Sequence, residues 1–490
     1  MSRGQRRVKK LLWYLVAVFV WIGLLAGRNT PLAAAQERDA SSPRELMVYP
    51  APAGESLSQD YRVEVNGIAV PVYTARVNDP PYNHLDYGGT YSFISFDFTG
   101  HVTITISASQ DIRGARIRPL SMNIRDTPID PHRTTFEIDR PVNLSFEPDG
   151  KKHPLLIFAN PPEQNAPKEG DADVIFFGPG IYHPAGGVIR LKSNQTLYIA
   201  GGAVVHAAVF IENAENVDIR GRGILDGSEW PHEKGPKEQL LEINSSRHVR
   251  VEGIVLRGSY GWTLVPVNSE DVTIENVKIC GGRVSNDDGI DIANSRHVLI
   301  RDSFIRTDDD CIALKGLNNK WGDVDDIRVE DSILWCDRAR ITLMGHESRA
   351  KYMQDIIYRD IDIIHFSMAP FLLQPGEEMT LKNVLFEDIR LNGAGQEDLA
   401  VINPTINQYM VRKVPGHIRN IEFRNLTLSG MPGSYRVVLA GHDKRHKTED
   451  VKFENVNVLG KPLTKSYAQL SVGKYTENIV FIPDSGGHEQ

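Results

Sequence analysis

A short apolar segment recurs along the C-terminal two-thirds of this 490-residue chain. Each copy alternates apolar residues with other residues and then reaches Asn, Asp or Gly, as in Val272–Asn276. The copies begin at Val217, Val249, Val272, Val298, Ile327, Ile356, Val384, Ile421, Val451 and Ile479. Neighbouring copies are about 23 to 37 residues apart, and a period in this range is typical of repeat architectures.

The period and the alternation together decide between three repeat architectures. Helical repeats are excluded because the apolar residues alternate with period two, which is the period of a β-strand. A propeller blade needs about 40 to 50 residues and four strands, more than one copy can supply. A parallel β-helix needs only short strands and turns, with loops of varying length. We therefore predict an all-β chain with a parallel β-helix over residues 171–490.

The turns between the predicted strands carry a second periodicity. Asn213, Asn268 and Asn294 each stand four residues before the first strand residue of their repeat. Identical residues at one turn of successive coils stack as a ladder. We expect their side-chain amides to form hydrogen bonds with the backbone of the next coil.

Residues 45–165 predict an all-β unit of a different kind. Apolar and polar residues alternate in Tyr61–Val65 and in Val102–Ser107. Further strands are expected at 115–117, 135–138, 142–146 and 155–158. Short strands separated by Gly, Pro, Asn and Asp favour an N-terminal β-sandwich domain. This segment holds no cluster of carboxylates or histidines, so we expect it to pack against the β-helix.

The first 35 residues have the pattern of a signal peptide. A basic start is followed by the apolar run Leu11–Ala26 and by a small-residue cleavage site that ends at Ala35. The alternative is an uncleaved anchor, because the apolar run is almost long enough to span a bilayer. We expect cleavage, a secreted or periplasmic protein, and no stable membrane insertion after cleavage.

Charge and cysteine content exclude other classes. The net charge of −8 and the pI near 6.0 argue against a nucleic-acid partner, which would favour a basic surface. The chain has only three cysteines, Cys280, Cys311 and Cys336, and this small, odd number argues against a disulfide framework. They form no Cys-x-x-Cys pair, so we expect buried free thiols and no metal site.

Two clusters of carboxylates stand out in the repeats. Asp287, Asp288 and Asp291 form the first, and Asp308–Asp310 form the second about one repeat later. Neighbouring coils of a β-helix are roughly 5 Å apart, so the clusters should stack. Carboxylates held this close resist simultaneous ionisation, and one of them is pushed to hold a proton near neutral pH. An acid beside a base is what acetal hydrolysis requires.

These clusters also carry a family resemblance. Asn286–Asp291 and Asp309–Ala313 resemble the Asn-Thr-Asp and Asp-Asp-Cys motifs of glycoside hydrolase family 28, the polygalacturonases. Phe177–Tyr182 and Gly221–Gly227 look like motifs of that family's first coils. The resemblance extends over residues 171–490, while the N-terminal domain is more like that of glycoside hydrolase family 49, the dextranase and isopullulanase group. Both families imply a right-handed parallel β-helix and an inverting mechanism that uses three aspartates.

The resemblance also implies residue roles. Asp288, Asp309 and Asp310 match the three catalytic aspartates, with Asp309 as the general acid and the other two activating water. Asp291 is expected to point into the local structure, and Asp308 has no counterpart. The implied substrate is an α-linked polysaccharide or oligosaccharide, either pectic or a neutral α-glucan. No metal or organic cofactor is implied.

The chain departs from the family at two motifs. The Gly-His-Gly motif should fall near residues 338–340, which contain no histidine, and His346 is the nearest candidate to replace it. The Arg-Ile-Lys motif that grips a substrate carboxylate is missing, because residues 369–374 are uncharged. Charge-assisted binding of a uronate would then need other cations. Candidates for substrate binding are Lys315, Arg338 and Arg340, and Trp321 in the polar insertion at 316–326.

Two other functions remain open from the sequence. A polysaccharide lyase on the same fold would need Ca²⁺ and a cationic base, and would release an unsaturated product. A non-catalytic carbohydrate-binding β-helix protein would bind without producing reducing ends. Other aromatic residues near the aspartates, Tyr260, Trp262 and Trp335, are expected mainly to pack.

Overall fold

The computed structural model describes residues 45–78 and 87–483. The predicted signal peptide and its cleavage site lie outside these residues. Two single 3-10 turns occur, η2 (Leu120–Met122) and η3 (Ala185–Gly187), and the other described elements are β-strands. Within the described ranges, no helix has the length and apolar character needed to cross a membrane. The predicted all-β class is confirmed.

The N-terminal strands form two sheets. The order in the five-stranded sheet is β3 (Ile68–Val70), β2 (Tyr61–Val65), β6 (Val102–Ala108), β9 (Arg133–Ile138) and β8 (Thr127–Asp130). The six-stranded sheet consists of β1 (Leu46–Val48), β5 (Gly89–Phe98), β11 (Leu155–Asn160), β10 (Val142–Glu147) and β7 (Arg116–Arg118), with β4 (Tyr73–Val77) paired to β5. The inner faces of the two sheets share one hydrophobic core, as in a sandwich.

Alternation explains which of these strands could be found from the sequence. In β2 the side chains of Tyr61, Val63 and Val65 are buried and the residues between them are exposed. The longest strand of the six-stranded sheet, β5, was not predicted. It runs next to β1, β4 and β11, and most of its residues are buried on both faces, so polar residues do not mark an outer face.

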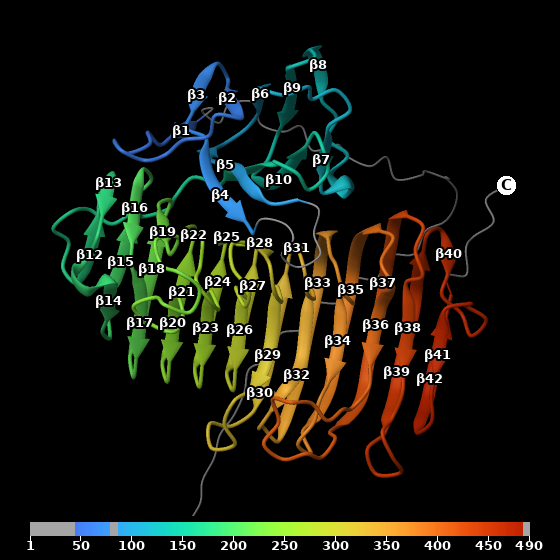
Figure 1. The fold of residues 1–490 in the computed structure, drawn as a ribbon. Helices are drawn as coiled ribbons and strands as arrows, with labels where there is room; N and C mark the ends of the chain where they lie inside the picture. Colours follow the sequence, from blue (N-terminus) through green and yellow to red (C-terminus); the bar gives the residue numbers. More distant parts are fainter. Residues whose placement is uncertain (1–44, 79–86, 484–490) are drawn as a thin grey trace, which may run out of the picture. The chain divides into compact units, whose positions relative to one another are not determined.

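The remaining strands wind into a parallel β-helix, whose successive coils run from green to red in Figure 1. One sheet has eleven strands: β14 (Val188–Leu191), β17 (Ala208–Glu212), β20 (Leu241–Asn244), β23 (Leu264–Val267), β26 (Ile290–Ala293), β29 (Ile312–Gly316), β32 (Thr342–Ser348), β34 (Phe371–Gln374), β36 (Asp398–Ile402), β38 (Arg436–Leu439) and β41 (Leu470–Val472). The twenty-stranded sheet begins with β12 (Val174–Phe177), β13 (Gly180–Tyr182), β15 (Thr196–Ile199), β16 (Ala203–His206), β18 (Glu215–Gly221), β19 (Ile224–Asp226), β21 (Arg247–Glu252), β22 (Val255–Arg257), β24 (Glu270–Glu275) and β25 (Lys278–Cys280). It continues with β27 (Arg296–Arg301), β28 (Phe304–Thr307), β30 (Val324–Glu330), β31 (Ile333–Cys336), β33 (Tyr352–His365), β35 (Thr380–Ala394), β37 (His417–Met431), β39 (Thr448–Val458), β40 (Lys461–Pro462) and β42 (Thr476–Ile482).

The register of the coils follows the sequence repeat. Val217 is the Cα partner of Val249, which pairs with Val272, which in turn pairs with Val298. The same register continues through every later copy to Ile479. The repeat read from the sequence is therefore the coil of the β-helix, and the predicted fold is confirmed.

Aromatic residues of the last coils stack inside the β-helix. Phe386 and Phe423 have ring centroids 4.7 Å apart, and Phe423 and Phe453 have centroids 5.1 Å apart with planes within 8°. Phe481 continues the stack at 5.2 Å from Phe453. One residue position per coil thus supplies a continuous core.

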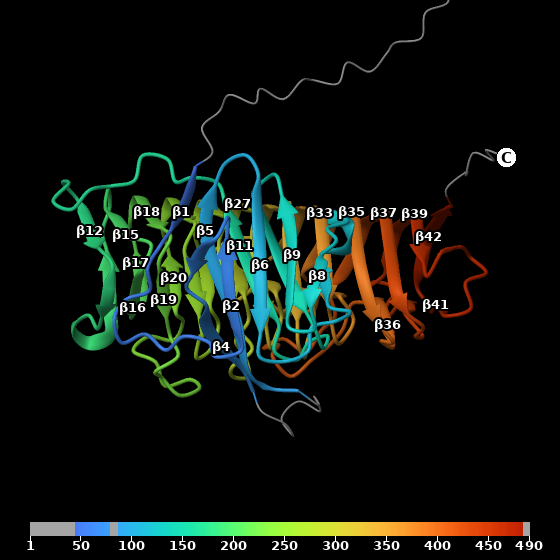
Figure 2. The same cartoon turned by 90° about the horizontal axis from the view of Figure 1, so that it is seen from above.

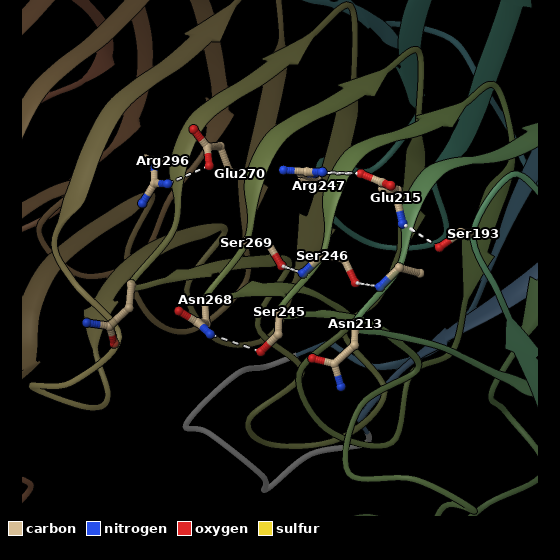
Figure 3. A pocket seen from close by; sticks show the side chains of 12 residues that line it. Ser193, Asn213, Glu215, Ser245, Ser246, Arg247, Asn268, Ser269, Glu270 and Arg296 are labelled. Atoms are coloured by element: carbon tan, nitrogen blue, oxygen red, sulfur yellow. Dashed lines mark hydrogen bonds and ion pairs between the residues drawn. The ribbon is translucent and has the colours of Figure 1, made fainter.

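The turn ladder differs in part from the expected one. The Asn294 amide does bond the backbone of the loop after the next strand, at Asn318 and Gly322. The Asn268 amide instead donates to the Ser245 hydroxyl. Backbone bonds between coils at this turn come from serines instead. The hydroxyls of Ser246 and Ser269 accept from amides of the preceding coil, as Figure 3 shows, and the Ser295 hydroxyl accepts from the amide of Ser269. These turns line a hollow of about 470 Å³ at the end of β26 opposite the aspartates.

The N-terminal sheets pack on the β-helix, as Figure 2 shows from above. Apolar residues of β4, β5 and β11 form a common cluster with Val204, Ile224 and Val255 of successive coils. Buried ion pairs cross the same contact: Arg222 binds both oxygens of Asp97 at 3.1 Å, and a neighbouring group is formed by Arg306, Asp337 and Tyr87. The three cysteines are buried and free, as expected.

Candidate active site

Two neighbouring turns bring the aspartates together. Asp287 and Asp288 precede β26, Asp291 lies within it, and Asp308–Asp310 precede β29. The two strands pair in parallel, with Asp291 opposite Ala313. Ile290 and Ile292 face the core of the β-helix, so Asp291 lies on the outward face between them.

Asp287 connects the two turns through the backbone. One of its carboxylate oxygens accepts hydrogen bonds from the amides of Gly282 and Arg283, and the other accepts one from the amide of Asp308 at 2.7 Å. Three backbone donors fix this side chain in place. Asp287 therefore positions the turns that carry its neighbours.

Lys315 lies between two carboxylates of the first cluster. Its Nζ is 3.1 Å from Asp288 Oδ2 and 2.7 Å from Asp291 Oδ1. Burial acts to lower the pKa of Lys315, but the charges of Asp288 and Asp291 outweigh it and hold this pKa well above its usual value. Burial also raises the pKa of Asp288 and of Asp291. Asp291 is fully buried and its carboxylate pairs with Lys315 of the next coil, so its side chain lies within the local structure.

Two arginines of the next coil face the second cluster. The Arg338 guanidinium donates to Asp308 at 2.9 Å and to Asp309. For Asp310, the backbone N–H of Arg340 donates at 3.1 Å, and the Arg340 guanidinium is 3.6 Å away. These arginines occupy the place where the family resemblance predicts a histidine.

Two carboxyl groups of the second cluster titrate near neutrality. Burial raises the pKa of Asp310 to about 7, with a further contribution from the charge of Asp309. Burial likewise raises the pKa of Asp308 to about 7, although Arg338 acts in the opposite direction. Asp309 is the most exposed of the three matched aspartates, at 8% against 3% for Asp288 and 2% for Asp310. Asp309 is thus best placed to touch a ligand, and Asp310 is poised to gain or lose a proton.

A β-bulge places His346 beside this cluster. Leu314 pairs with Met344 and Gly316 with Ser348, so three residues of β32 stand opposite Lys315 alone. Gly345 has φ 117°, and a Cβ there would lie 2.4 Å from the carbonyl oxygen of Gln374, so only glycine fits the bulge.

Within the part of the chain that the structure describes, the His346 ring forms no hydrogen bond with Asp288, Asp309 or Asp310. Its Nε2 is 3.3 Å from Gln374 Oε1, and its ring stacks against Tyr409 at 5.6 Å. Burial lowers the pKa of His346, and the nearby charge of Arg340 adds to this effect. A neutral imidazole therefore borders the site.

Aromatic residues line the outward face next to Lys315. Trp321 and Trp262 both pack, partly exposed, on the apolar patch formed by Val265, Val267 and Ala293. The Lys315 Nζ lies 3.6 Å from the centroid of the Trp262 ring, which is a cation–π contact. The sequence favoured a packing role for Trp262, and its link to Lys315 had no sequence signal. Tyr260 and Trp335 are fully buried, as expected.

The described residues contain three groups with the separations of metal ligands, and none of these groups includes an aspartate of the two clusters. The groups are His183, His206 and Glu229; Glu378, His417 and His446; and Glu270, Asp271 and His297. The charge of the aspartate clusters is instead partly balanced by Lys315, Arg338 and Arg340. Several carboxyl groups that differ in exposure and proton affinity can perform general acid–base chemistry.

Comparison with known proteins adds the family. A family model described as Glycosyl hydrolases family 28 matches residues 185–474, which is more than half of the chain and includes the six aspartates of the two clusters. A probable polygalacturonase of Arabidopsis thaliana is 32% identical over 109 residues, 22% of this chain and 24% of that protein. Polygalacturonase QRT2 of the same species is 26% identical over 202 residues, 38% of this chain and 44% of that protein. The chain thus spans less than half the length of these relatives.

Among solved structures, Dex49A from Penicillium minioluteum is similar, with a TM-score of 0.64 and 15% identity. The likeness covers 89% of this chain and 96% of that one. At this identity it concerns the fold alone, and its extent includes N-terminal strands as well as the β-helix.

Proposed function

The chain belongs to glycosyl hydrolases family 28, and on this basis we propose that it hydrolyses glycosidic bonds of a polysaccharide or oligosaccharide. The observation that carries the proposal is the stacking of Asp288, Asp309 and Asp310 on two paired coils. Their environments differ, which gives one carboxyl group contact with solvent and another a pKa of about 7. Such a set can supply both the acid and the base of acetal hydrolysis.

In the proposed mechanism, Asp309 donates a proton to the leaving glycosidic oxygen. Asp288 and Asp310 hold a water molecule and accept its proton as the water attacks the anomeric carbon. The anomeric carbon–oxygen bond breaks while the bond to water forms on the opposite face, so the configuration inverts. Inversion needs about 6.5 to 9.5 Å between acid and base, which neighbouring coils with a lateral offset can provide.

Arg338 must change partners for this step. Its guanidinium donates to Asp309 without substrate, and this contact occupies the carboxyl group that must reach the leaving oxygen. A sugar hydroxyl or carboxylate that binds Arg338 would release Asp309 to take up a proton. Substrate binding would then free Asp309 to act as the general acid.

We propose a galacturonate-containing substrate, in line with the names of the matched relatives. Arg338 and Arg340, whose side chains are about a quarter exposed, are the cations that a sugar carboxylate can reach. Lys315 is buried between Asp288 and Asp291, so its role is to hold these carboxylates rather than to bind a uronate directly. Trp262 and Trp321 would stack on sugar rings beside it.

The position of Lys315 also weighs against a lyase. A lyase on this fold needs a cationic side chain that can lose its proton and act as a base. The flanking aspartates hold the pKa of Lys315 well above its usual value despite burial, so it is a poor base at neutral pH. The N-terminal sequence pattern supports export to the periplasm or the exterior, where polysaccharides are found.

The test is release of reducing ends from polygalacturonate, rhamnogalacturonan, dextran and pullulan, measured side by side. Asp309→Asn and Asp288→Asn should each lower the rate by at least about 100-fold on whichever substrate is cleaved. Asp326→Asn is the matched control, because this exposed aspartate contacts Arg328 away from the cluster. Full activity in folded Asp309→Asn and Asp288→Asn variants would overturn the proposal. Binding without cleavage in all proteins would instead indicate a carbohydrate-binding protein.

A further inference from the structure

Three side chains of successive coils converge far from the aspartates along the β-helix. Glu378 precedes β35, His417 is the first residue of β37, and His446 precedes β39. These three strands pair side by side in parallel. One carboxylate oxygen and two ring nitrogens from these residues lie within 4.8 Å of one another.

The distances match the edges of a metal tetrahedron. His417 Nε2 is 3.2 Å and His446 Nε2 is 3.4 Å from the same oxygen, Glu378 Oε2. Zinc binds such atoms at about 2.0 to 2.2 Å, and ligands at tetrahedral corners are then about 3.3 to 3.5 Å apart. The ligand atoms are thus already spaced for one ion.

His446 is oriented as metal-binding histidines are. Its Nδ1 is 2.9 Å from both carboxylate oxygens of Asp443, so the Nδ1–H donates to Asp443. The lone pair of Nε2 then points toward Glu378. This nitrogen is buried, the residue is 6% exposed, and Nε2 has no hydrogen-bond partner among the described residues. A buried ring nitrogen that faces a carboxylate oxygen at 3.4 Å needs a proton or a metal cation between the two atoms.

The backbone holds the third ligand in place. Glu377 and Glu378 both have a positive backbone φ, 52° and 67°, which residues other than glycine rarely adopt. The Glu377 carboxylate accepts the amides of Val411 and Arg412, and the amide of Glu378 donates to the carbonyl of Pro415. Glu378 is therefore presented by a rigid turn.

We propose that Glu378, His417 and His446 bind one divalent metal ion of the zinc type, with Asp443 orienting His446. Two imidazoles and a carboxylate suit zinc among the common divalent ions. Glu378 and His417 are about a third exposed, which leaves an open side for the ion to reach the site and for water as the fourth ligand. The ion would fasten three coils near the C-terminal end of the β-helix.

A second cluster provides the matched control. His183, His206 and Glu229 have similar separations, but the side chains of His183 and Glu229 are about half exposed. His206 Nδ1 lies 3.6 Å from Asp226, too far for the hydrogen bond that would orient the ring. His183→Gln therefore removes an equivalent side chain from a more exposed cluster.

The experiment titrates zinc into the tag-free, EDTA-treated protein by isothermal calorimetry and follows thermal unfolding. We expect one ion per chain, and at a free zinc concentration about 100 times Kd the folded-to-unfolded ratio should rise about 100-fold. His417→Gln and His446→Gln should weaken binding at least about 100-fold, and Asp443→Asn about 10- to 100-fold. His183→Gln should bind as the unchanged protein does.

Absence of binding, or loss of binding in His183→Gln alone, would overturn the proposal. If a histidine variant does not fold, the visible spectrum of the Co²⁺-loaded unchanged protein decides, because tetrahedral coordination supports the site and octahedral coordination contradicts it. Hydrolysis does not enter this test. EDTA should lower the unfolding temperature without changing the initial rate of the proposed reaction.

Discussion

Arg340→Gln is the change that most sharply tests the electrostatics of the aspartate cluster. The guanidinium lies 3.6 Å from Asp310 Oδ1 and works against the burial and the Asp309 charge that raise the pKa of Asp310 to about 7. The backbone N–H of residue 340 keeps its hydrogen bond to the same oxygen after the substitution. The variant therefore removes one charge and leaves the turn in place.

The size of the effect follows from the distance and the exposure. Two unit charges 3.6 Å apart interact by about 4 to 5 kcal/mol at an effective dielectric constant of 20, which is an upper bound. Arg340 is about a quarter exposed, so water screens much of this interaction. An opposite charge at such a distance typically moves a carboxyl pKa by about 1 to 3 units. We expect the pKa of Asp310 to rise by about one unit.

The assay is the pH dependence of kcat/KM on the cleaved polysaccharide. Asp310 must be ionised to accept a proton from water, so the rate should fall below pH about 7 in the unchanged protein. In Arg340→Gln the acidic limb should move about one unit to higher pH. Arg328→Gln, an exposed arginine elsewhere, should leave the limb in place. A limb that stays or moves to lower pH in Arg340→Gln would refute the role given to Asp310.

Three further predictions concern stability. The pKa of Asp310 is about 7 in the folded protein against an ordinary 3.8, so the ionisation of Asp310 destabilises the folded state above pH 7 and has no effect below pH 4. At pH 8, Asp310→Asn should therefore be more stable to urea than the unchanged protein by about 1 to 3 kcal/mol, and equal stability would contradict this. Asp97→Asn should cost about 3 to 5 kcal/mol, because Arg222 is left as a buried unpaired charge; the exposed Asp111→Asn is the control, and similar costs for both would be evidence against the pair. Phe423→Ala should cost about 3 to 5 kcal/mol in thermal unfolding, because it opens the middle of the aromatic stack; a loss no greater than that of Phe481→Ala at the end of the stack would count against this reading.

The coils could be predicted from the sequence because one face of each short strand is always buried. Val272 and its counterparts fill the same position in every coil, and the period-two pattern makes that position visible. The strand β5 could not be found in this way, since both of its faces are covered. The covered strand β11 was still found, because its apolar run Leu155–Phe158 is uninterrupted, whereas β5 carries Ser92, Ser95 and Asp97 among its apolar residues.

At the candidate site, the aspartates were visible because they stand next to strands in a fixed register. The partners of these aspartates were less visible. Lys315 was expected to meet the substrate, yet its ammonium lies between Asp288 and Asp291. The strand register places Lys315 beside Asp291, but the approach to Asp288 also depends on the turn before β26, which the repeat pattern does not describe.

The proposed metal ligands have a weak signal in the sequence. Glu378, His417 and His446 stand four to six residues before the first apolar residue of their repeats. Register alone would have placed them within two residues of one another on three neighbouring coils. Their convergence also depends on the turn that gives Glu378 a positive φ, and the sequence does not show that turn.

The most direct test of the proposed hydrolysis is the proton NMR spectrum of the first product formed from an α-linked substrate. Inverting hydrolysis through Asp309, Asp288 and Asp310 predicts that the β-anomer forms first and then mutarotates, and that folded Asp309→Asn gives no such signal. A first-formed α-anomer would contradict inversion, and an unsaturated product would show that the chemistry is elimination rather than hydrolysis.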